Sequence, residues 1–365
     1  MKDWRRFKIT VLFLSIILLL AWVYRDSFNS RFFQDDKILL NLSTRFSWWY
    51  PIPNYPFRPV SIQIFYGTSM RFFGLNPLGY HLVLFSFFTG TLWLIYLISQ
   101  EIFHDKVKSL FTVFFYALNI SLFPLFFWIA TSYFSIGGFF FFLTIYLFLQ
   151  KGFISLMLAL FSFLLALGNN ELAFVTPLIL FLFSGYFRFR YKRLTPFFLI
   201  LTPLLLWRIF LSGIPKDPAY ALVFSLQALS TVKWYFIRAL NLPEGINRTS
   251  DPVLLVALLA FLGQVILAMG MKVIQRQFNL RFVSFCFSFF LVAAVPFYFL
   301  PGHMSSYYLS WSIFGFALLF ADLFSKTKLA IPVIVIYLLL TIAGLAFLGN
   351  THWIILKNTG PIGKF

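Results

Sequence analysis

Two adjacent aspartates, Asp35 and Asp36, are the residues of this sequence best suited to chemistry. They form the only neighbouring carboxylate pair in the chain and lie in the segment RFFQDDKILL, between apolar stretches. A carboxylate in such a place can accept a proton from a hydroxyl nucleophile, and general bases of this kind contribute roughly 10²–10⁴-fold in rate. The alternative interpretation is a solvated loop acid paired with Lys37 or Arg31.

Basic residues follow the two aspartates. Arg58 and Arg71 come next in the same inter-span segment, with Arg31, Lys37 and Arg45 nearby. An arginine can bind a phosphate oxygen pair in bidentate fashion, so Arg58 and Arg71 are candidate phosphate ligands. The alternative is a general attraction of these cations to anionic lipids.

Two further charged residues lie beside apolar segments. Glu171, in GNNELAFVTP, is a functional candidate because acids near membrane-spanning segments are costly to place. The alternative is a structural role: Asn169 or Asn170 would cap a helix, and Glu171 would lie in its first turn, where a negative charge is favourable. Arg208, in TPLLLWRIFLSG, either extends to the membrane surface or pairs with a phosphate.

Three uncharged candidates complete the set. His81 begins an apolar segment, and His303 lies in PGHMSSYY close to Tyr307. Each histidine is either a structural residue or a substrate-binding one. No metalloprotease, dinucleotide-binding, phosphate-loop or serine-hydrolase pattern is present. No cofactor is therefore predicted with certainty, and a divalent metal stays possible.

The composition predicts how these residues are positioned. The chain of 365 residues is 61% hydrophobic and 11% charged, whereas soluble domains carry roughly 25% charged residues. Windows of about 20 apolar residues recur along its whole length. We expect one all-α polytopic membrane domain over residues 1–365. Its eleven predicted spans are about 9–24, 78–99, 110–130, 133–149, 153–168, 172–187, 194–212, 253–271, 281–300, 306–324 and 329–349.

The charge distribution predicts the orientation of these spans. Alternate short connections are basic, as expected for cytoplasmic loops, and this explains the net charge of +18 without nucleic acid as a partner. We expect the N-terminus in the cytoplasm, the C-terminus outside, and the protein in the plasma (inner) membrane. The basic connections hold Lys2/Arg5/Arg6/Lys8, Lys106/Lys108, Lys151, Arg188/Arg190/Lys192/Arg193, Lys272/Arg276/Arg281 and Lys326/Lys328.

Two long loops, about 25–77 and 213–252, then lie outside as the first and fourth outer loops. Both contain apolar residues at helical spacing, which predicts amphipathic helices lying flat at the headgroup level. The predicted faces are Ile38/Leu42/Phe46/Trp49, Ile62/Phe65/Tyr66/Ser69/Phe73 and Leu222/Leu226/Leu229/Phe236/Leu240.

The order of these features resembles the GT-C superfamily of integral-membrane glycosyltransferases, which includes protein O-mannosyltransferases and aminoarabinose transferases. Members commonly carry an acidic pair after the first span, here FFQDDKI. YPFRPVSIQIFYGTSMRFFGLNPLGYHLVLF resembles their Arg-Pro, FGLNP and GYH pattern before the second span. Weaker similarities are GNNELAFVTP, where Asn170 replaces the usual Lys, and HMSSYYLSW, which lacks the usual Arg.

The resemblance implies a sugar donor carried on a polyprenyl phosphate and a hydroxyl acceptor on a lipid, glycan or protein. It implies one base and inversion, in contrast to the two cooperating carboxylates of glycoside hydrolases. Asp35 would be the base and Asp36 its alternative or a positioning group. Arg58, Arg71 and Arg208 would meet the phosphate, and Glu171 would orient the acceptor or a metal.

Two other functions compete with this interpretation. A transporter or flippase for lipid-linked sugars would commonly show internal repeats and broken helices, and neither is evident in the sequence. An O-antigen polymerase or ligase type of enzyme would depend on arginines of a late outer loop, here Arg238 and Arg248.

Overall fold

A computed structural model describes residues 2–45, 58–189, 191–207, 220–245 and 251–359. These residues form helices joined by turns, and none of them lies in a β-strand. In chain order, the helices are α1 Lys2–Val23, η1 Arg25–Asn29, α2 Asp35–Arg45, η2 Pro59–Ile64, α3 Phe65–Phe73, α4 Pro77–Phe103, α5 Lys106–Ala117, η3 Ile120–Leu122, α6 Phe123–Phe127, η4 Ile129–Thr131, α7 Ser132–Leu149, α8 Phe153–Leu167, η5 Glu171–Val175, α9 Thr176–Phe187, η6 Tyr191–Leu194, α10 Thr195–Trp207, α11 Gln227–Ala239, α12 Pro252–Ile274, α13 Leu280–Ala293, α14 Val295–Tyr298, η10 Ser306–Leu309, α15 Ile313–Phe324, α16 Ala330–Thr351 and α17 Trp353–Thr359.

Every predicted span contains a helix, but the helices differ in length. Four are long and apolar enough to cross a membrane: Pro77–Phe103, Ile129–Leu149, Pro252–Ile274 and Ala330–Thr351. A fifth candidate is the pair Lys106–Ala117 and Ile120–Phe127, which is bent by 54°. The described residues thus have the all-helical architecture and the long apolar helices that suit a helical membrane protein, and the count of eleven spans stays a prediction.

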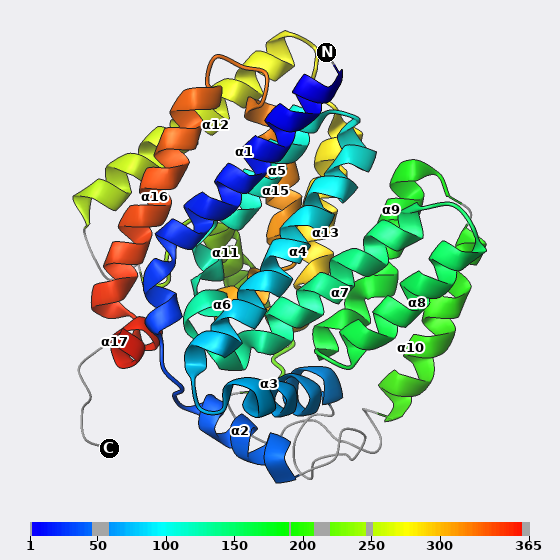
Figure 1. Ribbon diagram of the computed structural model, residues 1–365. Coiled ribbons are helices and arrows are strands. Elements are labelled where there is room, and N and C mark those ends of the chain that lie inside the picture. Colours follow the sequence, from blue (N-terminus) through cyan, green and yellow to red (C-terminus); the bar gives the residue numbers. More distant parts are fainter. Residues whose placement is uncertain (1, 46–57, 190, 208–219, 246–250, 360–365) are drawn as a thin grey trace.

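The helices form a bundle (Figure 1), and many of the buried core residues are aromatic. Helices α4, α5, α7, α13 and α15 pack against one another in its centre. Helices α12 and α16 pair on one side, while α8, α9 and α10 lie together on the other. More than half of the surface of each of four apolar residues of α12 is exposed, which suits a helix that faces lipid tails: Val253, Leu255, Val256 and Ile266.

Side-chain caps place the ends of several helices. Asn76 accepts a hydrogen bond from the backbone N–H of Leu78, with Pro77 at the first helical position, so α4 begins there. Asp105 and Asp251 cap α5 and α12 in the same way. Because each cap satisfies backbone donors at a helix start, these boundaries are encoded locally in the sequence.

One glycine allows two central helices to approach closely. A Cβ built at Gly315 in α15 would lie 2.3 Å from the backbone oxygen of Cys286 in α13. No side chain fits at that distance. A larger residue at this position would therefore push α13 and α15 apart.

Charged pairs gather at the end of the bundle away from α2 and α3 (Figure 1). Asp322 of α15 pairs with Lys108 of α5 and with Lys272 of α12, and Lys326 pairs with Asp105. These lysines belong to three of the connections predicted to be cytoplasmic, and the structure places them at one end.

The bend between α5 and α6 is held by a polar group of residues that we call the helix-break junction: Asn119, Asn241, Tyr337 and Thr341. Asn241 accepts a hydrogen bond from the backbone N–H of Ile120 at 2.6 Å and donates to Thr341 at 3.0 Å. Asn119 donates to the Tyr337 hydroxyl, which donates in turn to the Phe115 carbonyl. Backbone groups that lose their helical hydrogen bonds at the bend therefore bond to side chains of α16 and of the turn after α11.

Helices α2, α3 and α11 lie in the two segments predicted to form interfacial helices, and their predicted apolar faces differ in how far the protein buries them. In α3 and the turn before it, Ile62, Phe65, Tyr66 and Ser69 are buried in the protein, whereas Phe73 is exposed. Of the third predicted face, Leu229 and Phe236 lie in α11 and are exposed, as are Leu222 and Leu226 before it, while the residues of α11 buried in the protein are Thr231, Tyr235, Arg238 and Ala239. In α2 the buried residues are Asp36, Leu39, Leu40 and Ser43; Phe46 and Trp49 lie outside the described residues.

Candidate functional site

Asp36 is fixed inside the protein at the start of α2. Its side chain is fully buried and accepts hydrogen bonds from the Phe33 backbone N–H and the Tyr66 hydroxyl, each at 3.1 Å. Burial raises the pKa of Asp36 to about 7, although both hydrogen bonds oppose the shift. Asp36 therefore holds the first turn of α2 against α3 and is shielded from solvent.

Asp35, one residue earlier, is exposed. Partial desolvation raises its pKa, and the nearby His303 opposes this shift. The two aspartates thus have different surroundings despite their adjacency: Asp36 is held by the protein, whereas Asp35 can reach a ligand. Of the pair, Asp35 is better placed to accept a proton.

Arg58 and Glu171, which are 113 residues apart in sequence, form an ion pair. The Nε and Nη2 atoms of Arg58 donate to one oxygen of Glu171, at 3.0 and 2.6 Å. Burial alone would lower the pKa of Arg58, but the Glu171 carboxylate outweighs this effect and the pKa lies above its usual range. Their side chains remain 22% and 29% exposed, so a ligand can approach the pair.

The two chain segments that carry Arg58 and Glu171 are also joined by hydrogen bonds that do not involve the ion pair. η2 is a π-helix that begins directly after Arg58, and such turns are often found at functional sites. Its Val60 N–H donates to the Gly168 carbonyl, and the Ser61 hydroxyl donates to the Asn169 carbonyl. The segments that carry Arg58 and Glu171 would therefore stay together if the ion pair opened.

Tyr133 packs on the ion pair and lies near Asp35. The Arg58 guanidinium carbon lies 4.4 Å from the centre of the Tyr133 ring, which is a cation–π contact. Tyr133 also neighbours Tyr307 and lies within electrostatic reach of Asp35. Tyr307 is buried, and its hydroxyl is in hydrogen-bond contact with that of Tyr133.

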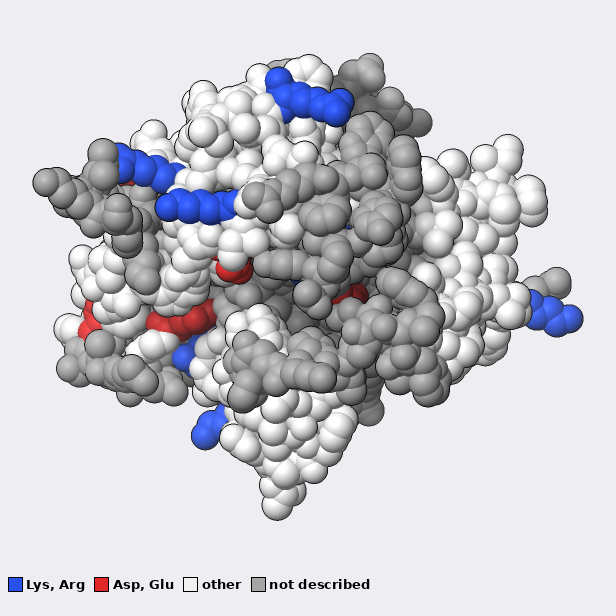
Figure 2. Space-filling model, turned by 90° about the horizontal axis from the view of Figure 1, so that it is seen from below, with Lys and Arg blue, Asp and Glu red and all other residues white. Residues whose placement is uncertain are grey.

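His303 lies at the edge of the same group. Its ring centre is 4.4 Å from that of Tyr220 and 5.8 Å from that of Tyr308. We call the set Asp35, Arg58, Tyr133, Glu171, His303 and Tyr307 the carboxylate–arginine cluster. Seen from the end that bears α2 and α3, acidic side chains lie in a band across the middle of the face, with basic ones spread around it (Figure 2).

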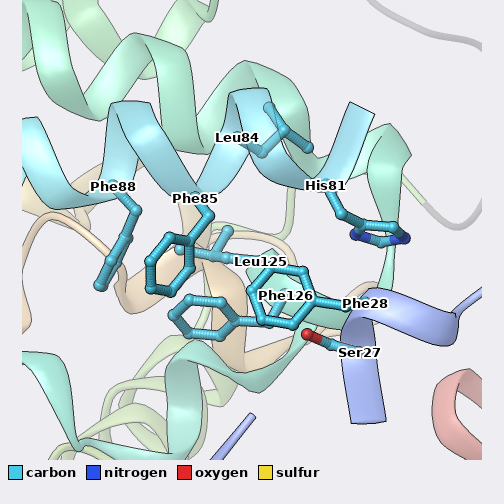
Figure 3. A pocket seen from close by; sticks show the side chains of 8 residues that line it. All are labelled: Ser27, Phe28, His81, Leu84, Phe85, Phe88, Leu125 and Phe126. Carbon is cyan, nitrogen blue, oxygen red and sulfur yellow. The ribbon is translucent and has the colours of Figure 1, made fainter. Parts of the chain in front are cut away.

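The structure places the other predicted residues elsewhere. Arg71 is exposed in the last turn of α3. His81 is buried in α4, where its Nε2 lies 3.3 Å from the Ser30 carbonyl. It borders a cavity of about 10 Å³, beside Phe28 and Ser27 (Figure 3). Such a space holds about one water molecule. Arg208 lies outside the described residues.

The two arginines named for a polymerase or ligase differ in position. Arg238 is 1% exposed, and its guanidinium lies 4.4 Å from the Trp234 ring. Its Nε and Nη1 atoms have no hydrogen-bond partner within the part of the chain that the structure describes. Arg248 lies outside the described residues.

Sequence reasoning missed Tyr66 and Tyr133. Tyr66 was expected only as part of an apolar face, yet its hydroxyl binds Asp36. Tyr133 lies at the start of an apolar span, where an aromatic residue is easily taken for membrane packing. A polar aromatic residue at the end of a span, level with a predicted acid, was the only available signal.

A metal site was left open by the sequence. Among the described residues, no three His, Cys, Asp or Glu side chains gather closely enough to hold an ion. The carboxylate–arginine cluster instead combines one accessible carboxylate, one anchored guanidinium and several hydroxyl donors. This set can take up a proton and bind an anion.

The chain was compared with protein-family models, curated proteins and solved structures, and no match was found in any of the three.

Proposed function

We propose that this protein is a membrane glycosyltransferase that moves a sugar from a polyprenyl-phosphate donor to a hydroxyl acceptor. The observation that carries the proposal is the carboxylate–arginine cluster: an exposed Asp35 shares one end of a membrane bundle with an anchored Arg58. A base for the acceptor and a cation for the leaving group are the two groups that such a transfer needs.

The reaction would proceed as a direct displacement. The acceptor oxygen forms a bond to the anomeric carbon while the bond from that carbon to the phosphate oxygen breaks. The bonding electrons leave with the polyprenyl phosphate, and the acceptor proton passes to Asp35. Because the leaving group is already an anion, Arg58 can stabilise it without a general acid.

Arg58 is oriented for this task by its neighbours. Glu171 engages Nε and Nη2, and Tyr133 covers one face of the guanidinium. The Nη1 edge then faces an incoming phosphate oxygen, or Glu171 yields its place to it. The backbone contacts of η2 with residues 168 and 169 keep Arg58 in position in either case.

The test is sugar transfer by Asp35→Asn in purified, reconstituted protein. We expect a loss of about 10²–10⁴-fold, the usual contribution of a general base, with unchanged thermal stability. Asp26→Asn is the matched control, because Asp26 is exposed beside Arg25 and outside the cluster. Transfer at the normal rate by Asp35→Asn would refute the proposal.

A transporter of lipid-linked sugars is the second candidate, and one observation favours it. The broken span formed by α5 and α6 is the kind of discontinuous helix that transporters place at their binding sites. Its polar side chains bond mainly to one another and to backbone groups, which is the arrangement of a structural joint. Counter-flow of the lipid-linked sugar without any covalent product would support transport over transfer.

A further inference from the structure

A surface groove lies beside the candidate site, between two connections at the same end of the bundle. It has a volume of about 600 Å³ and is lined by Phe28, Asn29, Arg31, Phe32, Leu75, Asn76, Pro77 and Leu78. One wall follows η1, and the other is the turn that leads from α3 into α4. The groove therefore lies close to the last residues of the apolar helix α1 and the first residues of α4.

The groove is preformed, because Tyr80 supports both of its walls. The Tyr80 ring packs edge-to-face on Phe32, with 4.9 Å between the ring centres. Its hydroxyl donates to the Gly74 carbonyl at 3.0 Å, which fixes the turn before Leu75. Gly74 has φ +56° and ψ −131°, a conformation that favours glycine.

The lining has the chemistry of an amphiphile site. Its apolar members include Leu75, which is 68% exposed, and Leu78, which is 41% exposed. Next to them, Phe72 is 78% exposed. These side chains would cost free energy in water but are suited to contact with acyl chains.

The single charge of the groove is positive. Arg31 is exposed, and no carboxylate of the described residues forms a salt bridge with it. No acid lines the groove, while Asn29 and Asn76 supply polar groups. An anionic headgroup above an apolar chain would match this distribution of charge.

We propose that the groove binds one anionic phospholipid of the surrounding bilayer, with its phosphate at Arg31 and its acyl chains along Leu75, Leu78 and Phe28. The position at the ends of α1 and α4 puts Arg31 at headgroup depth and the apolar wall at the depth of the upper chain carbons. This site is independent of the proposed glycosyl transfer. The acyl chains would cover the exposed aromatic and aliphatic side chains of the α3–α4 turn.

The test is native mass spectrometry of the full chain released from nanodiscs that contain equal amounts of phosphatidylglycerol and phosphatidylcholine. We expect the wild type to retain one phosphatidylglycerol. Arg31→Gln should lower the retained fraction about fivefold, as for one cation at an anionic lipid surface. Leu75→Ser should lower it as well, and it is compatible with folding because Leu75 is exposed.

Arg25→Gln is the matched control, since Arg25 is exposed at the same end of α1 but does not line the groove. Equal retention by Arg31→Gln and wild type would overturn the proposal, as would equal retention of phosphatidylcholine. Displacement of phosphatidylglycerol by an equal amount of a polyprenyl phosphate would also overturn it, because the groove would then belong to the carrier lipid. All of these measurements are made without sugar transfer, so they are separate from the test of Asp35.

Discussion

The helix-break junction and the carboxylate–arginine cluster are both polar regions in a largely apolar protein, yet they are built differently. The junction contains only neutral side chains, and Asn119, Asn241 and Thr341 are fully buried. Its hydrogen bonds connect these side chains to one another and to backbone groups left over by the bend. The cluster contains charges, and Asp35, Arg58 and Glu171 remain accessible.

This difference separates a structural polar group from one that is suited to ligands. A buried neutral network stabilises the fold when all of its members are satisfied, and a ligand could enter only by breaking it. Charged groups that stay accessible keep part of their binding capacity for another molecule. Charged groups that are accessible are therefore a better indication of the site than polar groups as such.

The largest effect on stability is expected from Asn241→Ala at the junction. The change removes the acceptor for the Ile120 N–H and the donor to Thr341 and the Tyr337 carbonyl. Buried groups that lose their partners cost about 1–3 kcal/mol each, so a total loss of about 3–5 kcal/mol is expected. Unfolding in detergent measures it, while transfer per folded molecule should stay normal. A strong loss of transfer at full stability would instead place the junction in the site.

The next effect concerns pH and Asp36. Its pKa is about 7 in the folded protein and about 4 in the unfolded chain, so the folded state binds the proton more tightly. The contribution of Asp36 to stability is then greatest below pH 4 and falls, by about 4 kcal/mol at most, as pH rises to about 7.

Asp36→Asn should remove this pH dependence, because the Tyr66 hydroxyl can accept from an amide as well as donate to a carboxylate. Unfolding curves at pH 5 and pH 8 measure the change. The same slope in Asp36→Asn and wild type would show that another group is responsible. Asp35→Asn is the control and should leave most of the slope in place, since Asp35 is exposed.

A smaller effect is expected from Arg58→Gln on the use of the donor. Hydrogen bonds to charged groups contribute about 1.5–3 kcal/mol, so kcat/KM for the polyprenyl-phosphate donor should fall about 10- to 100-fold. Arg58→Lys should recover only part of this loss, because lysine lacks the planar group that covers Tyr133. Full recovery by Lys would show that charge alone matters there.

The smallest effect is expected from Arg71→Gln. Arg71 is exposed in the last turn of α3 and is not part of the carboxylate–arginine cluster. Its loss should change kcat/KM less than twofold, as surface substitutions usually do. A loss as large as that of Arg58→Gln, measured side by side, would extend the cluster to α3.

The sequence was informative wherever a local rule decides the structure. Apolar windows predicted a helix in every expected span, and each of these spans contains one. Asp35, Arg58, Glu171, His303 and Tyr307 were chosen by residue type, and the structure brings them together. Their membership in a functional site stays a prediction.

The sequence could not show relations that depend on tertiary contacts. The pairing of Arg58 with Glu171 joins residues far apart in sequence, and nothing local predicts it. Asp35 and Asp36 are equivalent by type, and only packing on Tyr66 distinguishes them. The bend after Ala117 was also missed: residues 110–130 are mostly apolar, and although Asn119 and Pro124 lie among them, the partners that satisfy the bend, Asn241, Tyr337 and Thr341, are far away in sequence.

The bend has a consequence for biosynthesis. α5 has 12 residues and is about 18 Å long, so neither half of the bent pair spans a hydrocarbon layer of about 30 Å. The Asn241 side chain that satisfies Ile120 is made 121 residues later, and Tyr337 follows Phe115 by 222 residues. Nearly the whole polypeptide must therefore be synthesised before this segment can form its native hydrogen bonds. Nascent chains truncated before α16 would expose an unfinished joint to membrane proteases.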